Sequence, residues 1–337
     1  MSGSAGRYAE LAAVVRSFKG ELVSREQIGR LVDSSSLPEA VNLLTSGQLT
    51  LADGNLASVE TFLVQKLVKL AGSLAEYAPH DSRALIRLTA KRFEFDCVKQ
   101  ILKSIINHVE PEEALRHIMP AGRFNAERCK ELVESRNPNR VLDVLENEEL
   151  KRTIASRLAE KNDKAAISSI DQYYFKKLWS ASNLPDLLDA QSARGLIGPL
   201  IDQLNILLAL RARLVGLDSR STSDLLIPVD YTLGIPLNDL AEASNFANIM
   251  RVVDKTPYGN AFQGKTIAEG DVSAVERVLS RNHAQRCLNA FAGPPFNVGL
   301  ALALLFLKNY ELHDLFSVIN GKANNLPSDR ISECLIL

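Results

Sequence analysis

The apolar positions of the chain follow a helical period along nearly its whole length. Between residues 8 and 15, apolar side chains recur at spacings of three and four, and a longer stripe between residues 59 and 74 does the same. Such spacing places apolar side chains on one face of a helix. No stretch shows the two-residue alternation of a half-buried strand. The pattern therefore predicts an all-α protein.

Polar residues mark where several of these helices begin. Ser24 and Gln27, three residues apart before an apolar run, form the pattern of a capping box, and Ser36 with Glu39 forms a second one. Asn125 is of a type that accepts hydrogen bonds from the first amides of a helix. We expect helices to start directly after Ser24, Ser36 and Asn125.

One apolar helical pattern with an acid inside it occurs three times. The clearest copy covers residues 196–211, and degenerate copies lie at 88–105 and after residue 301. The corresponding polar residues are Asp96 and Lys99 in the first copy, Asp202, Asn205 and Arg211 in the second, and Glu311 and Asp314 in the third. These seven are the candidate site residues of the chain, and we call them the repeat residues.

The spacing of the copies predicts the domain organisation. Asp202 lies 106 residues after Asp96, and Glu311 lies 109 residues after Asp202. A period this long indicates domain-sized units, since the repeats of solenoid proteins are about 20–50 residues long. We therefore expect three similar helical domains, at 1–124, 125–235 and 236–337, arranged in tandem as a ring or funnel with pseudo-threefold symmetry.

The repeat acids admit a catalytic and a structural interpretation. A proton relay needs a path through a membrane, and the longest apolar run, residues 298–307, is about half of what a transmembrane helix requires. We therefore expect no transmembrane insertion, and a core helix at 298–307. We interpret the acids as structural groups that accept hydrogen bonds from a neighbouring helix N-terminus. For Asn205 and Arg211, a structural role and an interface role stay equally open.

Charge and composition exclude several classes of function. With 39 basic and 40 acidic residues mixed along the chain, the net charge is −1, which gives no overall electrostatic attraction for nucleic acid. The four cysteines form no CxxC pair, and the five histidines lack clustered partners, so we expect no metal site. The phosphate-binding, nucleophile-elbow and zinc-protease motifs are all missing from the sequence. We expect a non-catalytic protein without a cofactor.

Several stretches, taken in order, resemble the C subunit of archaeal-type rotary ATPases, which is related to the d subunit of the eukaryotic vacuolar ATPase. They begin with Tyr8, Arg16 and residues 22–26, continue through 171–175, 201–211 and 256–259, and end with 311–322 and 326–327. The resemblance spans almost the entire chain. Lys99 and Asp314 depart from the asparagine expected in the repeat.

The resemblance implies a protein that stands on the membrane rotor ring of proteolipid subunits and receives the foot of the central shaft, formed by subunits of the D and F type. Such a protein transmits torque between ion translocation and ATP synthesis or hydrolysis, and performs no chemistry itself. It would be a single copy within the complex, peripheral on the cytoplasmic face of the cell membrane. The alternative is a helical scaffold or adaptor that binds a partner helix or peptide.

Overall fold

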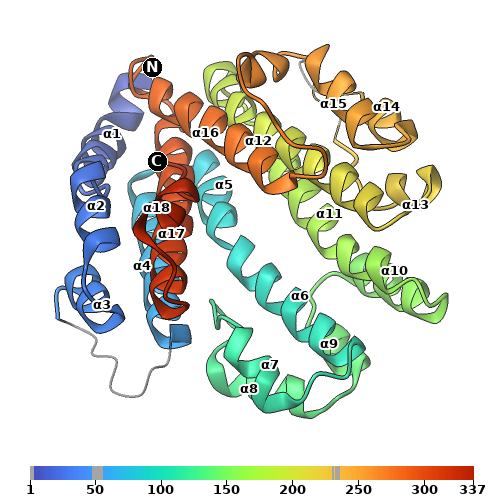
Figure 1. Ribbon diagram of the computed structural model, residues 1–337. Coiled ribbons are helices and arrows are strands. Elements are labelled where there is room, and N and C mark those ends of the chain that lie inside the picture. Colours follow the sequence, from blue (N-terminus) through green and yellow to red (C-terminus); the bar gives the residue numbers. More distant parts are fainter. Residues whose placement is uncertain (1–3, 48–55, 230, 232–235) are drawn as a thin grey trace. The chain divides into compact units, whose positions relative to one another are not determined.

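The computed structural model describes residues 4–47, 56–229, 231 and 236–337, and this part of the chain is helical with no strand (Figure 1). A single isolated bridge joins Ala121 and Phe124. The predicted all-α class is therefore confirmed. The chain divides into two compact units, one of residues 1–91 with 284–337 and the other of residues 92–283.

The first unit contains seven complete helices within its described residues. They are α1 (Ser4–Gly20), α2 (Arg25–Asp33), α3 (Leu37–Thr45), α4 (Leu56–Tyr77), α5 (His80–Ala90), α17 (Gly299–Ala323) and α18 (Ser328–Glu333). Helix α16 (Val272–Ala290) begins in the second unit and ends in this one. The first unit thus joins the beginning of the chain to its end.

Helix α17 is the core of the first unit. It packs against α1, α2, α3, α4, α5 and α18. Every residue from Gly299 to Leu307 is buried, so neighbours surround this part of the helix on all sides. A helix that is apolar around its whole circumference belongs in a protein core or a membrane. The apolar run at 298–307 is a core helix, as the sequence predicted.

The second unit contains the remaining helices of the described residues. They are α6 (Arg92–Ile106), α7 (Pro111–His117), α8 (Ala126–Glu134), α9 (Pro138–Asp143), α10 (Glu148–Ala159), α11 (Asp163–Ala181), α12 (Leu187–Leu214), α13 (Ser219–Ser223), α14 (Leu237–Glu242), α15 (Phe246–Asp254) and the 3-10 turn η1 (Gly259–Phe262). Helix α11 packs against α6, α10 and α12, and α12 packs against α13, α14 and α15.

Two separate apolar cores hold the second unit together. The first extends along the chain from Cys97 to Ile170, and the second from Ile206 to Leu279. Both cover stretches of equal length, and each begins within the long helix that carries a repeat acid. Equal stretches of chain that each close a core are expected if this unit holds two repeats.

The predicted helix starts are confirmed at the level of hydrogen bonds. The Ser24 hydroxyl accepts from the amide of Gln27 while the Gln27 side chain accepts from the amide of Ser24, so this capping box is complete. Ser36 and Asn125 cap α3 and α8. Glu39 differs from the expected box, because its carboxylate accepts from Ser35 and not from Ser36.

The division into three domains stays a prediction. The boundary expected after residue 124 lies within the second unit. The boundary expected after residue 235 falls at 232–235, outside the described residues.

One helix of the described residues, α12, is long and apolar enough to cross a membrane by length and composition. In the fold, 78% of its most apolar window is buried. It also contains the buried polar residues Asp202, Gln203 and Asn205. Burial of this kind is typical of a core helix in a compact protein.

Candidate functional site

The three long helices that carry the repeat residues end in the same way. Each is followed by a residue with positive φ, which is His108 after α6 (53°), Gly216 after α12 (72°) and Asn325 after α17 (54°). A left-handed residue at this place stops a helix and turns the chain. A short helix follows in each case, α7, α13 or α18. The repeat therefore includes a common turn and not only a common sequence pattern.

Asn205 fixes the segment that follows α13. Its side-chain oxygen accepts from the amide of Ile227 at 2.7 Å, and its side-chain nitrogen donates to the carbonyl of the same residue at 3.0 Å. Asn205 is 1% exposed. One carboxamide thus bonds to both backbone groups of the buried Ile227, whose carbonyl also accepts from the amide of Val229 at 2.9 Å. We call this contact the Asn205 anchor.

Asp314 does the same work at the corresponding place in α17. Its two carboxylate oxygens accept from the amides of Ile336 and Leu337 at 2.7 and 2.9 Å. Asp314 is fully buried, and the His313 ring nitrogen lies 3.5 Å from its Oδ1. Ile336 lies 22 residues after Asp314, the same separation as between Asn205 and Ile227. We call this contact the Asp314 anchor.

Lys99, the first-copy equivalent of Asn205, makes a different contact. Its ammonium lies 3.0 Å from Asp96 and 2.8 Å from Asp171 on α11. Burial by itself would lower the pKa of Lys99, but the charges of Asp96 and Asp171 outweigh it and the pKa is raised. In this copy a charge cluster between α6 and α11 occupies the place of an amide-to-backbone anchor.

The three repeat acids bond to different partners. Asp202 is 3% exposed and accepts from the hydroxyl of Tyr258 at 2.5 Å. Glu311 is 8% exposed and accepts from the amide of Val23, directly before the N-cap of α2, at 2.9 Å. Asp96 is about one-third exposed and pairs with Arg92 and Lys99. Val23 lies before α2, so its amide is not one of the first amides of that helix, and the expected role of the repeat acids stays a prediction.

Arg211 stands apart from the other repeat residues. Its guanidinium lies 2.6 Å from the Glu276 carboxylate on α16, and both side chains are about half exposed. Exposed ion pairs contribute about 0–1 kcal/mol to stability. The position of Arg211 leaves its charge accessible to a partner.

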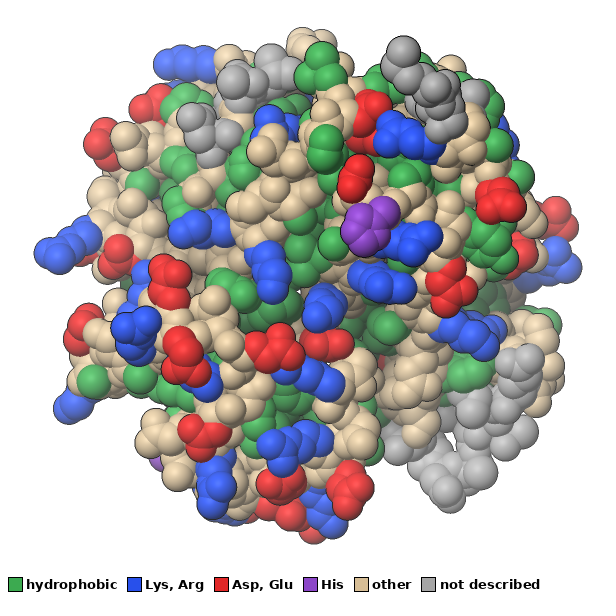
Figure 2. Space-filling model, turned by 180° about the vertical axis from the view of Figure 1, so that it is seen from behind, with side chains coloured by type: hydrophobic (Ala, Val, Ile, Leu, Met, Phe, Trp, Pro, Cys, Tyr) green, Lys and Arg blue, Asp and Glu red, His purple; other side chains and the backbone are tan. Residues whose placement is uncertain are grey.

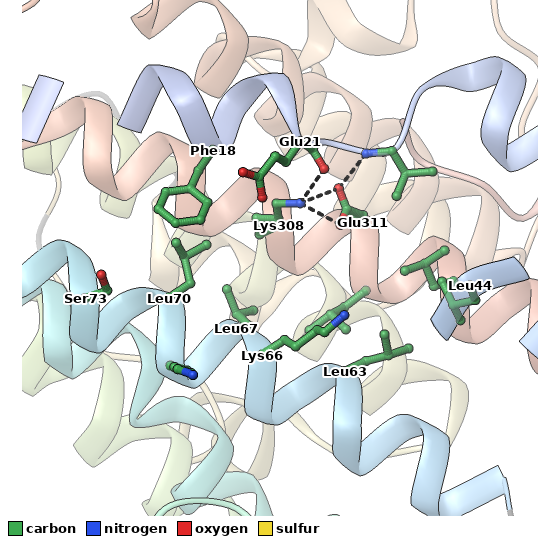
Figure 3. A pocket seen from close by; sticks show the side chains of 14 residues that line it. Phe18, Glu21, Leu44, Leu63, Lys66, Leu67, Leu70, Ser73, Lys308 and Glu311 are labelled. Atoms are coloured by element: carbon green, nitrogen blue, oxygen red, sulfur yellow. Dashed lines mark hydrogen bonds and ion pairs between the residues drawn. The ribbon is translucent and has the colours of Figure 1, made fainter. Parts of the chain in front are cut away.

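Glu311 also lines a pocket of about 450 Å³ in the first unit. The end of α1, together with α3, α4 and α17, forms its walls. Figure 3 shows Lys308 and Glu311 of α17 beside the end of α1, with Leu63, Leu67 and Leu70 of α4 on the opposite side. Lys308 donates to the carbonyl of Glu21 at 3.0 Å and to both oxygens of Glu311 at 2.9 and 3.1 Å. The remaining lining is mostly apolar: Phe18, Val23, Leu44, Leu63, Leu67, Leu70, Leu312 and Leu315.

Sequence reasoning missed the partners of the repeat residues. Asp171, Tyr258 and Val23 belong to stretches that carry the family resemblance, and each bonds to a repeat residue. They lie 72, 56 and 288 positions away from those residues along the chain. Asp171 lies within α11 and Tyr258 in the turn before η1, and no periodicity relates either residue to the repeat.

The described residues offer little for metal or thiol chemistry. In residues 4–47, 56–229, 231 and 236–337, no three His, Cys, Asp or Glu side chains come together as metal ligands could. The thiols of Cys97 and Cys129 lie 3.3 Å apart inside the first core of the second unit. Their hydrogen bond and then burial raise the pKa of Cys97, which keeps this thiol protonated.

The charges on the surface are mixed. Figure 2 shows acidic and basic side chains interspersed over the face in view, with apolar side chains between them. This matches the nearly balanced count of 39 basic and 40 acidic residues. A surface of this kind is suited to protein partners more than to a polyanion.

Together these features define a class: an all-helical protein with internal repeats, whose polar residues join one segment of the fold to another. The family model described as ATP synthase (C/AC39) subunit matches residues 11–334. The chain belongs to this family.

Curated relatives are similar in sequence to this chain over nearly its whole length. The C subunit of the A-type ATP synthase of Methanocaldococcus jannaschii is 24% identical, over 98% of this chain and 86% of its own. The C subunit of the A-type ATP synthase of Pyrococcus horikoshii is 23% identical, over 96% of this chain and 88% of its own. The C subunit of the A-type ATP synthase of Methanococcoides burtonii is 23% identical, over 100% of this chain and 96% of its own. The relatives are named as C subunits of an A-type ATP synthase, and all seven repeat residues lie within the range that the family model matches.

Proposed function

We propose that this chain is the non-catalytic central-stalk subunit of an A/V-type ATP synthase or ATPase. It links the membrane rotor ring to the central shaft and transmits torque between ATP synthesis or hydrolysis and the translocation of protons or sodium ions. Its partners are the D- and F-type shaft subunits and the ring of proteolipid subunits. The observation that carries the proposal is the family match over residues 11–334.

The internal bonding of the chain supports a mechanical role. A part that transmits torque must not let its segments slip, and buried hydrogen-bonded polar groups fix one arrangement of a core. The Asn205 and Asp314 anchors each tie an irregular segment to the middle of a long helix. Both anchors span 22 residues along the chain, which supports the proposed repetition of units.

The expected arrangement of the protein follows from the same proposal. Three helical domains, 1–124, 125–235 and 236–337, form a funnel around the end of the shaft. One copy sits on the cytoplasmic face of the membrane and needs no cofactor, metal or nucleic acid. The exposed Arg211 and the mixed charges of the surface are available to protein partners.

Omission of the chain tests the proposal. The ATPase complex is reconstituted into lipid vesicles with and without this chain, and ATP hydrolysis and ATP-driven ion uptake are measured on the same vesicles. We expect hydrolysis to continue without the chain while ion uptake is lost, and addition of the purified chain to restore uptake. Ion uptake that proceeds equally well without the chain would contradict a coupling role.

A further inference from the structure

The pocket of the first unit has the form of a groove along α4. Leu63, Leu67 and Leu70 follow one another at spacings of four and three, so they lie on one face of that helix. Leu312 and Leu315 of α17 belong to the same lining. Leu70 is only half-buried, although it belongs to the apolar stripe of α4. The lining is thus apolar, with Leu63, Leu67, Leu312 and Leu315 nearly buried and Leu70 the more exposed side chain.

The polar groups inside the groove are already satisfied. The Lys308 ammonium has three donors, and it has three acceptors: the carbonyl of Glu21 and the two oxygens of Glu311. Glu311 also accepts from the amide of Val23. An occupant therefore has no buried charge to neutralise here, and contacts an apolar floor beside a closed ion pair.

The edge of the groove carries charge that the fold leaves available. Lys66 and Lys69 of α4 line the groove and are exposed. Among the described residues, no carboxylate lies within ion-pair distance of either lysine, and Lys66 lies over the ring of Phe62 at 4.6 Å. Glu21, at the end of α1, is the acid on the rim. Two cations beside α4 complement an acidic occupant.

The length of the groove fits a short helix. The lining follows α4 from Leu63 to Ser73, which is about 15 Å at 1.5 Å per residue, or close to three turns. Helix-in-groove recognition uses apolar side chains at positions i, i+3 or i+4, and i+7, which span about 10.5 Å and so fit within this length.

We propose that this groove binds an amphipathic α-helix of a partner protein. The helix places its apolar side chains in the opening bounded by α4, α17 and the end of α1, beside Leu70, and acidic residues beside Lys66 and Lys69. Binding is independent of the ATPase assembly, because every contact comes from the first unit of this chain.

Two labelled peptides of about 16 residues test the proposal on the purified full-length chain. Both carry leucines at i, i+4 and i+7, and one has glutamates beside the leucines where the other has lysines. Fluorescence anisotropy at low salt gives the affinities. We expect the acidic peptide to bind at least about tenfold more tightly than the basic one, which corresponds to one order of magnitude in Kd.

Variants locate the binding. Lys66→Glu with Lys69→Glu should weaken the binding of the acidic peptide by about tenfold, and Leu70→Gln should weaken this binding by a similar factor. Lys103→Glu with Lys164→Glu, at exposed lysines of the second unit, makes the same charge change and should leave the affinity within about twofold. Circular dichroism of each variant establishes that it is folded.

Other outcomes overturn the proposal. Equal affinity for the two peptides, or an affinity for the acidic peptide that the Lys66 and Lys69 reversals leave unchanged, would exclude this groove as its site. Binding to phosphatidylglycerol vesicles that depends on the two lysines, without binding of the acidic peptide, would assign the groove to a lipid. Either result leaves the coupling role unaffected, since that role is measured on the assembled complex.

Discussion

The Asn205 and Asp314 anchors do the same job with different chemistry. Each side chain projects from a long central helix to backbone groups 22 residues later. Asn205 gives one donor and one acceptor to Ile227, whereas the Asp314 carboxylate accepts from two consecutive amides. The hydrogen-bonding groups of the bound segment therefore decide which residue fits. The two copies share a connection in space, and the residue type follows from it.

Removal of the Asp314 carboxylate should have the largest effect. In Asp314→Ala, the amides of Ile336 and Leu337 both lose their acceptor, and we expect a loss of about 3 kcal/mol in the free energy of unfolding. Urea denaturation measures this loss. Glu10→Ala, an exposed acid on α1, is the matched control and should change stability by less than about 0.5 kcal/mol. An equal change in both variants would mean that the anchor contributes nothing.

Exchange of the two anchor residues tests the difference between them. Asn205→Asp replaces the donor to the Ile227 carbonyl with a carboxylate oxygen, which repels that carbonyl. Asp314→Asn directs an NH₂ group toward an amide donor. We expect each to cost about 2 kcal/mol at pH 7 in urea denaturation. If either exchange is neutral, the chemistry of the bound segment does not select the residue.

The bond between Tyr258 and Asp202 should contribute less than the Asp314 anchor, because it joins one donor to the carboxylate where the anchor joins two. Tyr258→Phe removes the hydroxyl that lies 2.5 Å from this buried carboxylate, and we expect a loss of about 2 kcal/mol in the free energy of unfolding. Urea denaturation measures the change. Tyr77→Phe, at an exposed tyrosine of α4, is the control. A loss no larger than that of the control would mean that this bond adds nothing to stability.

The charge cluster of Lys99, Asp96 and Asp171 makes the free energy of unfolding depend on pH in the alkaline range. The pKa of Lys99 is raised by Asp96 and Asp171 against the opposing effect of burial, so its contribution is complete below the unfolded-state pKa of about 10.4 and is lost as the pH rises through the folded-state value. Lys99→Met should therefore cost about 1–2 kcal/mol at pH 7 and less at pH 11. Urea denaturation at both pH values gives the difference, with Lys103→Met as the control. A cost independent of pH would mean that packing, and not charge, accounts for it.

The smallest effect belongs to Arg211. Because Arg211 and Glu276 form an exposed pair, Arg211→Ala should change the free energy of unfolding by less than about 1 kcal/mol. A larger loss in urea denaturation would give Arg211 a structural role. Stability close to that of the parent, together with weaker binding to the ring or the shaft, would give it the interface role.

The class of the fold and part of its local detail could be predicted from the sequence. The apolar period, the Ser24 capping box and the core helix at 298–307 are properties of neighbouring residues, and the structure has all three. Partners such as Tyr258 for Asp202, or Val23 for Glu311, could not be predicted in this way, because they depend on how distant helices pack. The groove along α4 was missed for the same reason, since Leu70 has the spacing of a core residue.

The most direct test of the coupling role is a binding measurement with two separate baits. The purified chain is tested against the detergent-solubilised rotor ring and against the central-shaft heterodimer, at low and moderate salt. We predict binding to both baits, and survival of both complexes in moderate salt, where simple charge attraction is screened. Failure to bind either bait would contradict the account, because a coupling protein must hold the ring and the shaft together.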